Sequence, residues 1–161
     1  MFAKYYLEIP RPLADVKEAM LAESPEAWLP GIVEAGTDLE HRLLTDVGFT
    51  VGGHRLDRRV EVEIGKGAPL GAGVVIPLSW RAASAESLFP RLDADLELAP
   101  LGPSITQLSV SARYEPPLAG LGRILDRTLL HRVAEAVIRD FTERVAQTLR
   151  ERLAEPVPSE S

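Results

Sequence analysis

Hydrophobic residues recur every three or four positions between Leu121 and Leu153, and no Pro or Gly interrupts this stretch after Gly122. The apolar positions are Leu130, Ala134, Val137, Ile138, Phe141, Val145 and Leu149. This spacing predicts one long amphipathic helix. Since such a helix is not stable alone in water, we expect its apolar face to lie on a wide apolar surface.

Six segments before this helix alternate apolar and polar residues, which predicts strands with one apolar and one polar face. The first runs from Phe2 to Ile9 and is ended by prolines; the others cover about 41–51, 54–64, 74–80, 92–98 and 106–114. Gly52-Gly53 predicts a two-residue hairpin turn that pairs position 51 with 54, 49 with 56 and 43 with 62. Pro77 cannot donate to a ladder, so it predicts a bulge or an edge.

The alternation also predicts which side chains face the helix. On the helix side we expect Val60, Val62, Leu96, Leu108 and Val110, and on the opposite side Glu61, Glu63, Asp93, Asp95 and Glu97. A shift of one residue in the register would reverse every one of these positions.

Two short helices are expected after the first strand. Pro12 can open a helix that runs to about Ala22, with Val16, Met20 and Leu21 facing inward. Ser24-Pro25-Glu26 has the residues of a helix start, and the helix that follows would carry Trp28, Leu29, Ile32 and Val33.

Length and composition favour one ordinary globular domain. The chain has 161 residues, of which 45% are hydrophobic and 26% charged. We expect a domain over 1–154 and a frayed polar tail over 155–161. The net charge of −6 disfavours nucleic acid as a partner, and the absence of cysteine excludes disulfides and thiolate chemistry. We find no signal peptide and no membrane span, so a soluble cytoplasmic protein is expected.

The candidate polar motifs give no catalytic or metal site. The glycines of 65–73 lie between two strands rather than before a helix, which indicates a hairpin rather than a phosphate loop. Asp93, Asp95 and Glu97 point outward side by side, so they do not converge on a cation. His41, His54 and His131 lack zinc-ligand spacing. We expect His131 on the helix surface and His54 in solvent, and we predict no metal and no cofactor.

Arg58 has two possible roles. The hairpin register places it on the inner face, where an unpaired guanidinium is costly. It could anchor a ligand carboxylate or phosphate. Alternatively, a bulge turns it outward with Arg59, or it pairs with Glu34 or Asp46; we favour these structural roles.

The order of a strand, two short helices, an antiparallel meander and a long helix resembles the helix-grip fold. The segment Tyr114-Glu115-Pro116-Pro117, followed by Leu121-Gly122-Arg123, Asp126-Arg127 and His131-Arg132-Val133-Ala134, is similar to bacterial cyclase/dehydrase-like proteins. The chain thus resembles the SRPBCC superfamily, which includes START lipid-transfer domains, polyketide cyclases and aromatases, and plant pathogenesis-related ligand binders.

The resemblance implies an α+β fold in which a curved antiparallel sheet of six to seven strands wraps around one long C-terminal helix. It also implies a ligand cavity between them, but no invariant catalytic set to transfer. The expected ligand-binding residues are Trp28, Phe49, Arg58, Val62, Ile76, Leu78, Trp80, Leu96, Leu108, Val110, Tyr114, Ala134, Val137 and Phe141. We expect access to the cavity beside Trp28 and Pro69.

Three functions fit this interpretation. The first is a binding or carrier protein, monomeric or homodimeric, for a small hydrophobic or amphipathic molecule such as a lipid or a polyketide. The second is a polyketide cyclase, aromatase or dehydratase-like enzyme, with Arg58, His54 or Tyr114 orienting an enolate or a proton transfer. The third is an interaction protein with a filled core and an exposed apolar patch. The sequence favours the binding protein over the enzyme, because no acid, base or nucleophile is clearly placed inside.

Overall fold

The computed structural model describes residues 2–22, 28–29, 33–34, 43–51, 54–82, 91–115 and 127–154. Side chains are described for these residues except 33–34, 43–51, 54–59, 82, 115, 127 and 129–130. The elements are β1 (Phe2–Ile9), α1 (Leu13–Leu21), β2 (Val33–Glu34), β3 (Leu43–Val51), β4 (His54–Ile64), β5 (Ala68–Leu70), β6 (Gly73–Ala82), β7 (Arg91–Gly102), β8 (Ile105–Glu115) and α2 (Arg127–Ala154).

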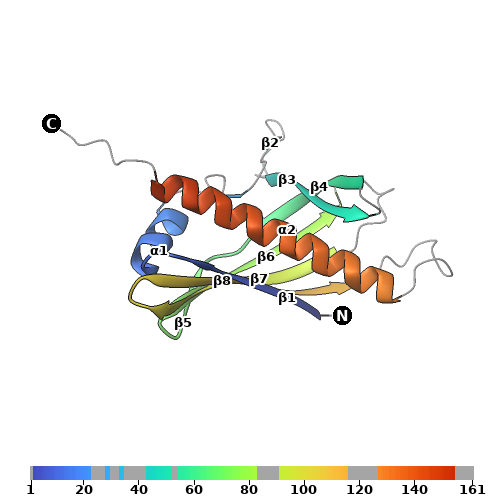
Figure 1. The fold of residues 1–161 in the computed structure, drawn as a ribbon. Coiled ribbons are helices and arrows are strands. Elements are labelled where there is room, and N and C mark those ends of the chain that lie inside the picture. Colours follow the sequence, from blue (N-terminus) through green and yellow to red (C-terminus); the bar gives the residue numbers. More distant parts are fainter. Residues whose placement is uncertain are drawn as a thin grey trace.

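The strands form one antiparallel sheet in the order β1-β8-β7-β6-β4-β3-β2, and β5 pairs with β6 beside this path. Six of the strands are the long ones that alternation predicts. The short strands β2 and β5 are additional. Figure 1 shows α2 lying across one face of the sheet, with α1 beside its C-terminal part. This is the α+β architecture expected from the sequence.

The predicted register is confirmed. Val51 pairs with His54, Phe49 with Leu56 and Leu43 with Val62; residues 52–53 lie outside the described residues. All five residues expected on the helix side are buried. Glu63, Asp93 and Asp95 are exposed, whereas Glu61 and Glu97 are half-buried. One face of the sheet is therefore apolar and the other polar, as the alternation requires.

Helix α2 presents its apolar stripe to this face. Its buried residues are Ala134, Val137, Ile138, Phe141, Thr142, Val145, Ala146 and Leu149. The ring of Phe141 packs against Trp80 with a centroid distance of 5.2 Å and an interplanar angle of 57°. The phase of the predicted helix is confirmed; residues 121–126 and the side chain of Leu130 lie outside the described part.

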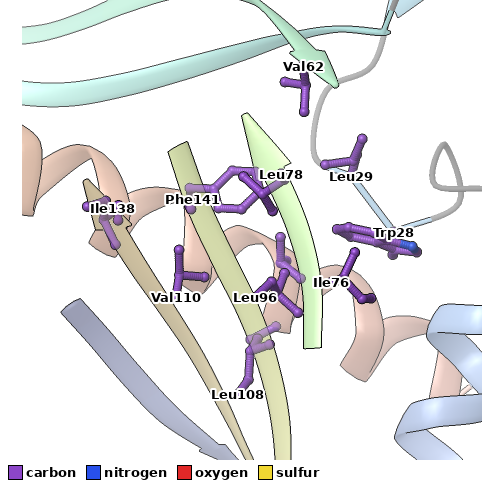
Figure 2. Packing of buried hydrophobic residues seen from close by; sticks show 14 of the residues in the cluster. Trp28, Leu29, Val62, Ile76, Leu78, Leu96, Leu108, Val110, Ile138 and Phe141 are labelled. Atoms are coloured by element: carbon purple, nitrogen blue, oxygen red, sulfur yellow. The ribbon is translucent and has the colours of Figure 1, made fainter. Parts of the chain in front are cut away.

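The sheet holds α2 from two sides. The backbone of α2 comes closest to β1 and β3, which lie towards opposite edges of the sheet, and it lies farther from the central strands. Side chains such as Phe141, Leu78 and Leu96 lie between helix and sheet over the centre (Figure 2). The size of the side chains over the central strands therefore determines how much space remains between helix and sheet.

Two predictions about the N-terminal region are wrong. Leu21 is 43% exposed. At 100° per residue it lies about 140° around the helix from Val16, whereas Met20 shares the inner face with Val16. Val33 belongs to β2 and pairs with Leu44 instead of continuing a helix. Trp28 and Leu29 are buried in a turn, and the rest of the second predicted helix lies outside the described residues.

Pro77 lies where β6 changes its neighbour. On one side β6 pairs with β7 continuously through Pro77 and Asp95. On the other side the pairing with β4 ends at Leu78 and that with β5 begins at Val75, while Gly65 N–H donates to the Pro77 carbonyl at 2.7 Å. The missing N–H of proline therefore falls in a gap between two partner strands. The edge predicted at Pro77 is confirmed only around this residue, on the side of β6 where the partner strand changes.

The glycine-rich segment 65–73 connects strands, as expected, and does not lead into a helix. Gly71 has φ +58° in the turn between β5 and β6. Gly73 lies so close to β7 that a Cβ there would collide with the Leu98 carbonyl. Among the described residues, no helix is long and apolar enough to cross a membrane.

Candidate functional site

Most of the residues predicted to line the cavity whose side chains are described lie on the inner face of the sheet and on the facing side of α2, and Trp28 lies in a turn beside them. Twelve of the fourteen have described side chains, and all twelve are buried: Trp28, Val62, Ile76, Leu78, Trp80, Leu96, Leu108, Val110, Tyr114, Ala134, Val137 and Phe141. Trp28 lies beside Leu29 and Ile76 at one side of this group (Figure 2). The side chains of Phe49 and Arg58 are outside the described set. Contact of these residues with a ligand remains a prediction.

Two of the largest inner side chains, Trp80 and Tyr114, lie in one row across the sheet. Val62 pairs with Trp80, Trp80 with Leu92, and Leu92 with Tyr114. Directly paired residues of neighbouring antiparallel strands share a face, so all four side chains point towards α2. Trp80 and Tyr114 are two strands apart, roughly 10 Å between backbones. The polar side-chain atoms of this row are Trp80 Nε1 and Tyr114 Oη.

Tyr114 is joined to α2 through His131. The Tyr114 Oη lies 2.9 Å from His131 Nδ1, and His131 Nε2 lies 3.0 Å from Glu135 Oε1. Because the carboxylate can only accept, Nε2 carries a proton; in a neutral ring Nδ1 then accepts from the tyrosine hydroxyl. Tyr114 is 1% exposed, and His131 is half-buried. The three side chains connect the buried end of the row to solvent.

Burial raises the pKa of the Tyr114 phenol above its ordinary value, and the negative charge of Glu135 raises this pKa further. Both causes disfavour the phenolate. At neutral pH Tyr114 therefore carries its proton and acts as a hydroxyl group.

Trp80 contributes the other polar atom. Its side chain is 1% exposed, and among the described residues its Nε1 is the buried side-chain nitrogen or oxygen without a hydrogen-bond partner. Phe141 on one side and the cross-strand neighbours Val62 and Leu92 offer no acceptor from their side chains. The inner face thus contains an unused donor in apolar surroundings.

His131 was expected on the surface of the helix, and this expectation is wrong in part. Its exposed edge pairs with Glu135 one turn later, as the sequence spacing of four allows, but its other edge meets Tyr114. The contact between His131 and Tyr114 depends on how α2 crosses β8. In the sequence, only the predicted inward position of Tyr114 pointed to this contact. His41 and the side chain of His54 lie outside the described residues.

A hollow lies on the face of the sheet opposite α2. It is an open recess of about 500 Å³. Its lining includes Pro77, Ser79 and Ser111 of neighbouring strands, together with Phe2, Asp93 and Arg113. Since its charged groups are in contact with water, this recess lacks the buried polar atoms found beneath α2. The part of the chain that the structure describes contains no cluster of three potential metal ligands.

Comparisons with known proteins identify the fold. No family model matches this chain. No curated protein matches it in sequence either. Solved structures do match.

A protein from Thermus thermophilus has a TM-score of 0.57 at 16% identity, over 94% of this chain and 99% of the other. An aromatase/cyclase from Streptomyces sp. R1128 has a TM-score of 0.55 at 13% identity, over 95% and 93%. Norcoclaurine synthase from Thalictrum flavum has a TM-score of 0.56 at 12% identity, over 97% and 87%.

These likenesses extend over nearly the whole chain, but the identities are low, so they establish architecture and not activity. They agree with the order of elements and with a sheet that holds one long helix. The chain has the helix-grip fold.

Proposed function

We propose that this protein binds a small hydrophobic or amphipathic molecule in the space between the sheet and α2. The observation that carries the proposal is the composition of the inner face: a largely apolar surface with few polar side chains. The buried hydroxyls of Thr106 and Thr142 donate to the Arg11 and Ile138 carbonyls, which leaves Trp80 Nε1 and Tyr114 Oη as the polar atoms that a ligand could contact. Ligand sites in proteins are typically lined in this way, with few polar groups that fix orientation.

The sizes of the facing side chains support this location. Ala94 and Ala112 pair with each other across β7 and β8, and Ala134 lies on the buried face of α2. Small residues on both layers leave room where larger ones would close it, because protein interiors are otherwise filled to crystal-like density. The outer recess is a weaker candidate, since a hydrophobic ligand there would keep much of its surface in water.

Two measurements on the full chain test the proposal. Native mass spectrometry of freshly purified protein should show a retained small molecule or, after delipidation, uptake of one. Titration with the neutral fluorescent probe N-phenyl-1-naphthylamine should then compare Ala134→Leu, which adds bulk on the inner side, with Ser111→Leu, which adds bulk in the outer recess. We expect a loss of affinity of about tenfold in Ala134→Leu only, which corresponds to about 1.4 kcal/mol.

Circular dichroism of both variants must first show the native signal, because loosely folded proteins also bind this dye. Binding that is weakened only by Ser111→Leu, or no binding of any probe, would contradict the proposal.

Tyr114, His131 and Glu135 favour a second candidate function, an enzyme of the cyclase or dehydratase type. When both ring nitrogens of His131 carry a proton, Nδ1 donates to the Tyr114 oxygen and the phenol proton can point to a ligand. As a water molecule removes the α-proton of a ketone, the phenol could give its proton to the enolate oxygen, and the Nδ1 proton could pass to the resulting phenolate. The raised pKa of Tyr114 suits a proton donor rather than a base. Tyr114 and His131 together have the parts of an acid–base site. Tyr114 is a buried hydroxyl that could contact the ligand, and His131 is a half-exposed partner that contacts water.

Exchange of the α-hydrogens of a bound methyl ketone for deuterium tests this second function. In D₂O, NMR should show faster exchange with the native protein than in buffer, and Tyr114→Phe should abolish the acceleration. If the ketone binds but its exchange rate equals that in buffer, the enzymatic function is contradicted and the binding function stands.

A further inference from the structure

The indole N–H of Trp80 restricts what the proposed ligand can be. An indole nitrogen donates a hydrogen bond and accepts none. In water this N–H would be solvated, and here it is buried with no hydrogen-bond partner among the residues that the structure describes. Native proteins leave very few buried polar groups in that state, so each one indicates a missing partner or a special role.

The surroundings of Trp80 explain why the described residues do not supply the acceptor. The cross-strand neighbours Val62 and Leu92 are aliphatic, and the facing ring of α2 is Phe141. The backbone carbonyls of the central strand are used in ladders on both sides of β6. An acceptor for this N–H must therefore enter the space between sheet and helix from outside the described framework.

A charged acceptor fits these surroundings poorly. The described side chains around Trp80 are apolar, and burying an anion without a cation costs far more than burying a neutral carbonyl. Tyr114, on the same row, offers a hydroxyl group whose oxygen can also contact a ligand. The polar positions are thus suited to neutral oxygen groups on an apolar molecule.

We propose that the ligand is an apolar molecule that carries a neutral acceptor oxygen, such as a ketone, and that this oxygen accepts the Trp80 Nε1 hydrogen bond. The proposal rests on the proposed function. It adds the chemical class of the ligand and the residue that selects it, and Trp80 acts by binding the oxygen rather than by moving a proton.

A pair of probes with the same shape isolates this hydrogen bond. 2-Acetylnaphthalene and 2-ethylnaphthalene differ in the carbonyl oxygen and share the ring. Isothermal titration or fluorescence should give a dissociation constant for each with native protein and with Trp80→Phe. We expect the ketone to bind about five- to tenfold more tightly than the hydrocarbon to native protein, the usual value of one net hydrogen bond. In Trp80→Phe this preference should disappear.

The hydrocarbon serves as the control for packing, since any cavity left by Trp80→Phe weakens both probes. If this variant does not fold, NMR of the native protein replaces it: the indole N–H resonance of Trp80 should move downfield with the ketone and not with the hydrocarbon. Trp28→Phe, which leaves one indole, assigns the resonance.

The outcomes separate the two proposals. Equal affinity of the two probes, or a ketone preference that survives in Trp80→Phe, would overturn the role of Trp80 and would leave the binding function standing; in that case water serves the indole N–H. Failure of both probes to bind would count against the binding function itself.

Discussion

The hydroxyl of Tyr114 lies 2.9 Å from His131 Nδ1, and this contact joins the last strand of the sheet to the described start of α2. Further along the helix, the Tyr5 hydroxyl donates to Glu143 at 2.9 Å, and Arg150 donates to the Glu8 carbonyl at 2.9 Å. Helix α2 is therefore held to the sheet by polar contacts along its length, while its apolar stripe covers the inner face. The first of these contacts is also the only one among the three that involves a fully buried side chain.

Replacement of Tyr114 by Phe should change the pH dependence of stability. Burial raises the pKa of Tyr114 in the folded protein above the value of about 10 expected for the unfolded chain. The folded state then holds this proton more tightly, so the contribution to stability is complete below about pH 10 and is lost as the pH rises through the folded pKa. Urea unfolding between about pH 7 and 11 should show a smaller alkaline loss in Tyr114→Phe than in native protein.

Tyr5→Phe provides a parallel case, because its hydrogen bond to Glu143 also raises the pKa of the Tyr5 phenol. At neutral pH the cost of Tyr114→Phe should be only about 1 kcal/mol, since half-exposed His131 can accept a hydrogen bond from water instead. Identical pH profiles for native protein and Tyr114→Phe would show that burial does not shift this pKa.

Phe141 should contribute strongly to stability. It is 1% exposed and packs on Trp80. Phe141→Ala should lower the free energy of unfolding by about 3–5 kcal/mol if its surroundings are filled, and by less if it borders open space. The exposed neighbour Arg132 is a matched control on the same helix, with an expected effect of Arg132→Ala within about 0.5 kcal/mol. Urea unfolding measures both, and equal small effects would mean that α2 does not pack as described.

The register can be tested by removing a carboxylate at position 93 and, separately, introducing one at the adjacent position 94. Asp93 is exposed on the outer face of β7, and Ala94 is 6% exposed on the inner face. Asp93→Ala should change stability by less than about 0.5 kcal/mol. Ala94→Asp should cost roughly 3 kcal/mol or more, because it buries an unpaired carboxylate. A comparison of thermal midpoints decides between them, and similar midpoints for the two variants would be incompatible with the register.

Two glycines of the β5–β6 region should respond differently to alanine. At Gly71 the space is open and only its φ of +58° opposes a side chain, so Gly71→Ala should cost roughly 1–2 kcal/mol. At Gly73 a Cβ would collide with the Leu98 carbonyl of β7, so Gly73→Ala must push two strands apart and should cost more. Chemical denaturation measures which of the two variants loses more stability. A smaller loss in Gly73→Ala than in Gly71→Ala would show that β6 and β7 separate easily.

The sequence allowed the long strands, their register and the buried face of α2 to be predicted, because periods of two and of three to four residues leave a direct trace in the order of residues. The strands β2 and β5 have two and three residues, which is too short for alternation to be visible. Their pairing depends on the neighbours β3 and β6 rather than on their own pattern.

The site was predicted less completely. The inward position of Trp80 and Tyr114 followed from the register, but the contact of Tyr114 with His131 depends on the crossing of two elements and left no periodic signal. The outer recess arises from small residues on adjacent strands, Ser79 and Ser111 among them, and it could have been found by reading the registers side by side. The predicted interior cavity and the position of Arg58 remain predictions.

Where a bound molecule lies is the most direct test of the proposed function. Intermolecular nuclear Overhauser effects should be recorded between 2-acetylnaphthalene and the full-length protein. The proposed function predicts contacts from the naphthalene protons to the Phe141 ring, the Trp80 ring and the Ala134 methyl group, all on the inner side. Contacts to Phe2 and Arg113, which border the outer recess, with none to Phe141 or Ala134, would contradict it.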